Sequence, residues 1–64
     1  MEMEQYLKEV VEVYEGFGAL VSEAKGVDKS KPLEPQYEKI RVRQKELTDR
    51  LYELNEMFSR GEVK

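Results

Sequence analysis

Apolar residues recur along two segments of the chain at alternating intervals of three and four positions. The first series is Met3, Leu7, Val10, Tyr14, Phe17, Val21 and Ala24. The second series is Tyr37, Ile40, Gln44, Leu47, Leu51, Leu54 and Phe58. This spacing is typical of positions a and d of the heptad repeat, through which one helix packs against another. The pattern therefore predicts two helices, over residues 2–25 and 36–60.

Residues 26–35 separate the two helices and read GVDKSKPLEP, a combination of glycine and proline that is typical of a loop. Gly26 suits the end of the first helix, and Gly61 suits the end of the second, after which we expect the chain to fray. Pro32 and Pro35 both suit the first turn of a helix, which needs no backbone donor. So short a loop makes the helices antiparallel neighbours. We expect the 64-residue chain to form one all-α domain, an antiparallel helical hairpin with coiled-coil-like packing.

The apolar surface of the first helix is wider than one a/d seam. If Leu7, Tyr14 and Val21 occupy position a, the residue before each of them occupies position g and is also apolar. These g residues are Tyr6, Val13 and Leu20. A single neighbouring helix covers a seam but not a stripe of this width. We therefore expect two hairpins to associate about a two-fold axis into a four-helix bundle. A monomeric hairpin would instead leave the g residues uncovered, as a binding site for another protein.

The residues predicted to carry self-association come from both helices. They are Leu7, Val10, Val13, Tyr14, Phe17, Gly18, Leu20, Val21, Leu47, Leu51, Leu54 and Phe58. The first half of the second helix is basic, whereas the open end of the hairpin is acidic, so charge favours a head-to-tail arrangement of two copies. Gln44 interrupts the second seam, and it either fixes the register of the bundle or reaches water at its end.

Two glycines stand inside the first helix, in the stretch YEGFGAL. Gly16 falls at position c and Gly18 at position e, both outside the expected core, and each costs about 1 kcal/mol relative to alanine in an exposed helix. Two interpretations stay open. The glycines are tolerated defects with a local bend, or Gly18 allows another backbone to come close. A phosphate-binding loop is disfavoured, because the motif lacks a third glycine and a preceding strand.

The composition removes most catalytic chemistry. The chain has no cysteine and no histidine, which excludes disulfides, iron–sulfur clusters and thiolate zinc, and removes the commonest general base. The acidic residues avoid positions a and d and are therefore expected to form a solvated face. We expect no enzymatic activity, cofactor, metal or small-molecule substrate. With no secretory signal and no apolar run near the ~18 residues of a membrane span, we expect a cytoplasmic protein without a membrane partner.

A basic run in the second helix is the best candidate for contact with nucleic acid. Its members are Lys39, Arg41, Arg43 and Lys45. On a helix these cations spread around the surface, and the net charge of the chain is −3, so we favour structural charge pairing over nucleic-acid binding. Tyr52 lies outside the expected core and is either an ordinary exposed residue or an anchor for a partner.

In outline the pattern resembles the small Rop-type hairpin dimers, some of which act as adaptors or regulators. The resemblance covers the whole chain in pattern only, and no family motif matches residue by residue. We expect a small non-enzymatic adaptor or regulator that acts through helix–helix contacts, with itself and another protein as partners. The alternatives are a Rop-like nucleic-acid-binding regulator that uses the basic run, and an oligomerisation fragment of a longer protein.

Overall fold

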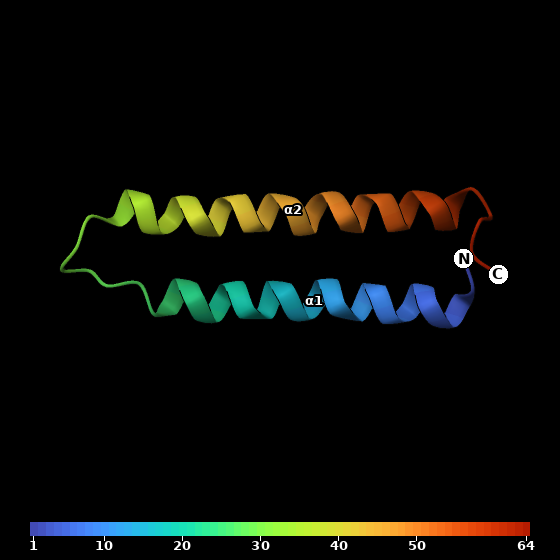
Figure 1. The fold of residues 1–64 in the computed structure, drawn as a ribbon, viewed down its shortest axis with the longest axis horizontal. Coiled ribbons are helices and arrows are strands. Elements are labelled where there is room, and N and C mark those ends of the chain that lie inside the picture. Colours follow the sequence, from blue (N-terminus) through green and yellow to red (C-terminus); the bar gives the residue numbers. More distant parts are fainter.

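The computed structural model describes residues 1–64 and contains two helices, α1 (Met3–Lys25) and α2 (Leu33–Ser59). They run antiparallel, side by side, with the loop at one end and both chain ends at the other (Figure 1). The predicted all-α helical hairpin is confirmed. Its extents are 50 × 16 × 10 Å and its radius of gyration is 15.0 Å. A compact domain of this length has a radius of gyration of about 11 Å, so the hairpin is an elongated rod.

Helix α2 begins at Leu33, three residues before the predicted start. Proline in the first turn does not end a helix, because the first four backbone N–H groups have no acceptor within the helix. Pro35 is the third residue of α2 and Pro32 is its N-cap. The two prolines therefore bracket the first residues of α2, and both precede the point where intrahelical donors are needed.

The loop is organised by the side chain of Gln36. Its Oε1 accepts a hydrogen bond from the backbone N–H of Asp28 at 2.9 Å, and its Nε2 donates to the carbonyls of Asp28 at 3.0 Å and Pro32 at 2.9 Å. The Asp28 carboxylate accepts bonds from the hydroxyl of Ser30 at 2.6 Å and from its backbone N–H at 2.9 Å. These two bonds hold the pKa of Asp28 below its usual value of 3.8, because both favour the charged form. The chain reversal is therefore built from specific hydrogen bonds.

The far end of α2 is closed by a glycine motif. Gly61 has a φ of 75°, its N–H donates to the carbonyl of Phe58 at 3.1 Å, and the N–H of Glu62 donates to the carbonyl of Met57 at 3.0 Å. This pair of bonds is the Schellman arrangement, in which glycine adopts the left-handed conformation at little steric cost. The prediction that Gly61 ends the second helix is confirmed.

The residues after Gly61 do not fray. The backbone N–H of Met3 donates to the carbonyl of Lys64 at 2.6 Å, and the N–H of Lys64 donates to the carbonyl of Met1 at 2.9 Å. The ammonium group of Met1 donates to the carbonyl of Glu62 at 2.7 Å. The predicted fraying is wrong, because these bonds join the last residues to the first ones.

The core lies between the helices and is small. Its buried side chains are Val13, Leu20, Leu47 and Leu54. Partly buried side chains packed against them are Tyr6, Val10, Phe17, Ile40, Leu51 and Met57. Helix α1 therefore contacts α2 mainly through positions d and g, and not through the expected a and d positions.

Gly16 explains why α2 lies on this side of α1. A Cβ atom at Gly16 would be 2.8 Å from Cδ2 and 3.0 Å from Cδ1 of Leu47. The missing side chain lets Leu47 approach the backbone of α1 on the side of positions c and g. The prediction that Gly16 lies outside the core is thus wrong. A Cβ at Gly18, by contrast, would meet nothing within 4 Å.

Candidate interaction surface

One side of α1 carries large apolar side chains that the hairpin leaves uncovered. The exposed fraction is 54% for Leu7, 60% for Tyr14 and 56% for Val21. These residues repeat every seven positions, so they form one stripe along the helix. We call Leu7, Tyr14 and Val21 the outer stripe.

The inner stripe consists of Tyr6, Val13 and Leu20, one position earlier in each heptad, and α2 covers it. Val13 and Leu20 are buried, and the half-buried ring of Tyr6 stacks on Phe58 with the ring centroids 5.4 Å apart. The prediction that a lone hairpin leaves the g residues uncovered is therefore wrong. Because Leu47 seats against Gly16, α2 lies over the inner stripe and leaves the outer stripe open.

The uncovered surface continues onto α2. Four residues of α2 share one heptad phase, and they are Tyr37, Gln44, Leu51 and Phe58. Tyr37 and Phe58 are 39% and 52% exposed. Val21 of the outer stripe and Gln44 both line a shallow hollow of about 240 Å³ between the helices, which places the two rows on the same side of the hairpin. We call the outer stripe together with this α2 row the open face.

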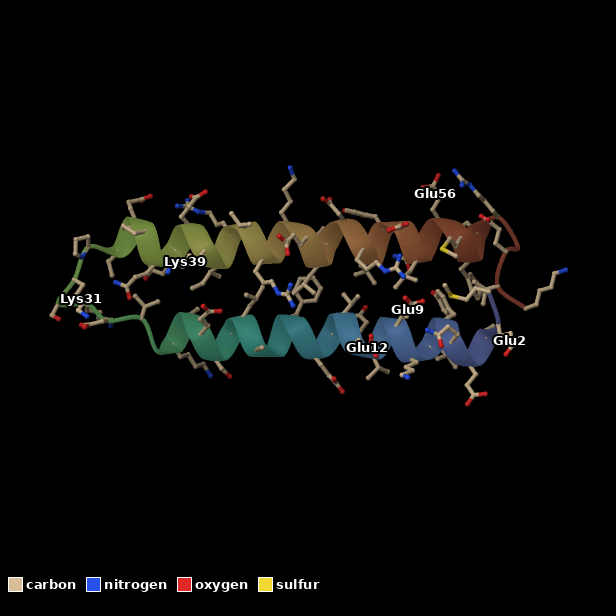
Figure 2. All side chains as sticks on the ribbon, viewed as in Figure 1. Glu2, Glu9, Glu12, Lys31, Lys39 and Glu56 are labelled. Carbon is tan, nitrogen blue, oxygen red and sulfur yellow. The ribbon has the colours of Figure 1, made fainter.

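The opposite side of the hairpin is charged. Arg50 of α2 contacts the carboxylate of Glu9 on α1, and it lies 3.1 Å from the carboxylate of Glu53 on its own helix. The hydrogen bond to Glu9, and to a smaller extent the one to Glu53, raises the pKa of Arg50, so its guanidinium group stays protonated. Glu9 points toward α2, whereas Glu56 points away from α1 (Figure 2). Glu9 lies about 140° around the helix from Tyr14, so the ion pair is remote from the open face.

The two arginines of the basic run have partners within α2. Arg41 lies 3.1 Å from Glu34, and Arg43 lies 3.3 Å from Glu46. Two members of the run form no ion pair in the structure, Lys39 and Lys45. Since local carboxylates offset the arginines, the run offers less positive potential to a phosphate backbone than its sequence suggests.

The acidic side chains do not gather into a site. No group of three or more acidic residues is close enough together to hold a metal ion. Glu2 lies just before α1, Glu12 lies on α1 and Glu56 lies on α2 (Figure 2). Neither helix contains a stretch that is both long and apolar enough to cross a lipid bilayer.

The residues predicted for self-association fall into three groups. Buried within the hairpin are Val13, Leu20, Leu47 and Leu54. Half-buried are Val10, Phe17 and Leu51. Exposed are Leu7, Tyr14, Gly18, Val21 and Phe58. Only the last two groups present surface to another molecule, and most of their members lie on the open face.

No protein-family model, curated protein or solved structure gives a significant match to this chain. The open face is consequently the feature on which a functional assignment rests.

Proposed function

We propose that this chain is a small non-enzymatic adaptor or regulator, which acts in the cytoplasm through helix–helix contacts as a homodimeric four-helix bundle. The observation that carries the proposal is the open face, where Leu7, Tyr14 and Val21 are each more than half exposed. Contiguous exposed apolar patches of this kind mark protein–protein interaction sites in proteins that stay in solution.

The small core supports the same proposal. Only 4 of 64 residues are buried, and a core in so short a chain seldom supplies more than about 3–5 kcal/mol. The accessible surface is 5113 Å², whereas a compact monomer of 7.6 kDa exposes about 4300 Å². A second hairpin on the open face would add a layer of side chains to the existing core and remove this excess surface.

The homodimer is tested by sedimentation equilibrium over a concentration series, with helicity followed by circular dichroism on the same samples. We expect a mass near twice 7.6 kDa and a loss of helicity on dilution. Tyr14→Glu should shift the mass to that of the monomer, because it places a charge in the open face. Tyr52→Glu is the matched control, since Tyr52 is 69% exposed but lies outside the open face. A fully helical chain with the monomer mass at every concentration would overturn the homodimer.

A further inference from the structure

The two halves of the hairpin carry opposite charge. Residues 18–47, the half nearer the loop, contain seven basic and five acidic side chains, which gives a net charge of +2. Residues 1–17 and 48–64, the half nearer the chain ends, contain four basic and nine acidic side chains, which gives −5. The N-terminal ammonium and C-terminal carboxylate lie at the same end and cancel. The rod therefore has a basic end at the loop and an acidic end at the termini.

Two two-fold arrangements bring the open faces of two copies together with their helices aligned. If the axis runs along the helices, both loops lie at the same end, and α1 of each copy faces α2 of the other. If the axis lies in the interface at right angles to the helices, the loops lie at opposite ends, α1 faces α1, and α2 faces α2. The first arrangement places like-charged ends together, whereas the second places each basic end against an acidic end.

We propose that the occupant of the open face is a second copy of this chain with its loop at the opposite end, so that the two Tyr14 side chains meet at the two-fold axis. Tyr14 is the middle residue of α1, with eleven helical residues on either side. In this arrangement Leu7 of one copy lies near Val21 of the other, because both are seven positions from Tyr14. The inference rests on the proposed function, and it adds the orientation and the contact residues.

The surface that two hairpins expose in excess of one compact protein is comparable with the area that an obligate pair buries. Two separate hairpins expose about 10,200 Å², twice the 5113 Å² of one copy, whereas one compact protein of the combined mass exposes about 7100 Å². The difference of about 3100 Å² falls within the roughly 2000–5000 Å² that obligate homodimers bury. Association into a compact bundle would therefore bury an area typical of an obligate homodimer, and the distribution of charge sets the orientation of the two copies.

Disulfide cross-linking tests the orientation directly, because the chain has no cysteine of its own. Facing helices 8–10 Å apart bring Cα atoms at the axis into the range that a disulfide needs. Tyr14→Cys should form a linked dimer under mild oxidation, at least about tenfold faster than Tyr52→Cys, since facing sites in a dimer have millimolar effective concentrations. A mixture of Leu7→Cys and Val21→Cys should favour the mixed disulfide, and it leaves Tyr14 in place.

The outcomes separate the orientation from the dimer itself. Because Tyr6 stacks on Phe58, Tyr14 lies level with residue 50 of α2, and the neighbouring Leu51 is the open-face residue nearest that height. If the loops lay at the same end, Tyr14→Cys would instead link to Leu51→Cys of the second copy. That result, with a dimer mass by sedimentation, would overturn the orientation and leave the proposed function standing. A monomer mass for the unmodified chain would overturn both.

Discussion

The inner and outer stripes of α1 are one heptad position apart, yet the inner side chains are buried or half-buried and the outer side chains are more than half exposed. Val13 is 4% exposed, whereas the adjacent Tyr14 is 60% exposed. Both stripes are apolar at every heptad, so hydrophobicity alone does not distinguish them. The difference arises from Gly16, which lets Leu47 approach on the inner side. The heptad pattern thus gives the width of the apolar surface of α1. The glycine at position 16 decides which part of that surface α2 covers.

The comparison also assigns separate roles to the two stripes. The inner stripe holds the hairpin together, whereas the outer stripe is available for a second copy. Substitutions in the inner stripe or its partners should change the stability of the hairpin at every protein concentration. Substitutions in the outer stripe should act mainly through association and should therefore depend on concentration.

The largest expected effect comes from comparing two leucine-to-alanine variants, one in the core between the helices and one in the outer stripe. Leu54 is fully buried in the core between the helices, so Leu54→Ala should cost about 2–5 kcal/mol and abolish most helicity, because the total stability is small. Leu7→Ala, at a residue that is 54% exposed, should leave the core between α1 and α2 unchanged and raise the concentration at which dimers form, so that its cost shrinks as the protein concentration rises. Urea unfolding over a concentration series separates the two. Equal losses in both variants at all concentrations would contradict the division between stripes.

A smaller effect is expected from the two glycines, which make a matched pair on one helix. Gly18→Ala should stabilise the hairpin by up to about 1 kcal/mol, because its Cβ enters open space. Gly16→Ala gains the same helix propensity, but its Cβ would lie 2.8 Å from the end of the Leu47 side chain, which must shift, so that part or all of the gain should be offset. Thermal unfolding at one protein concentration should place Gly16→Ala below Gly18→Ala. The reverse order would show that Leu47 is not held against Gly16.

The smallest expected effect concerns the ion pair that joins the helices on the charged side. Glu9→Gln should destabilise the hairpin by about 0–1 kcal/mol, since Arg50 is partly exposed and solvent screens the pair. Glu12→Gln is the control, because Glu12 is exposed and forms no ion pair. The difference between the two variants in urea unfolding should disappear in about 1 M salt, where the Debye length is near 3 Å. A difference that persists in high salt would point to packing instead of charge.

The hairpin could be predicted from the sequence because its signals are repeated. Two series of residues at heptad spacing, apolar except at Gln44, agree with a short loop that contains glycine and proline, and Gly61 marks the end of α2. The side of α1 that meets α2 could not be predicted, since it depends on one contact between Gly16 and Leu47. Heptad spacing places Gly16 at position c. It does not tell how closely a leucine of the other helix approaches the backbone of α1 there.

Two further features of the structure left no signal in the sequence. The role of Gln36 in the loop depends on three hydrogen bonds to groups that folding brings together. The contact between Glu9 and Arg50 joins residues 41 positions apart, and neither belongs to a recognisable motif. In both cases polar side chains find partners through the three-dimensional arrangement and not through local spacing. Periodicity reports repeated contacts well and single contacts poorly.

The position of both chain ends at one tip of the rod has a consequence for the proposed dimer. With the loops at opposite ends, the termini of the two copies would lie at opposite tips of a bundle whose length is close to the 50 Å of one hairpin. Anything joined to the termini would then be held apart at a nearly constant separation. The bundle would act as a rigid spacer, and the lengths of α1 and α2 would set the distance between the two pairs of termini.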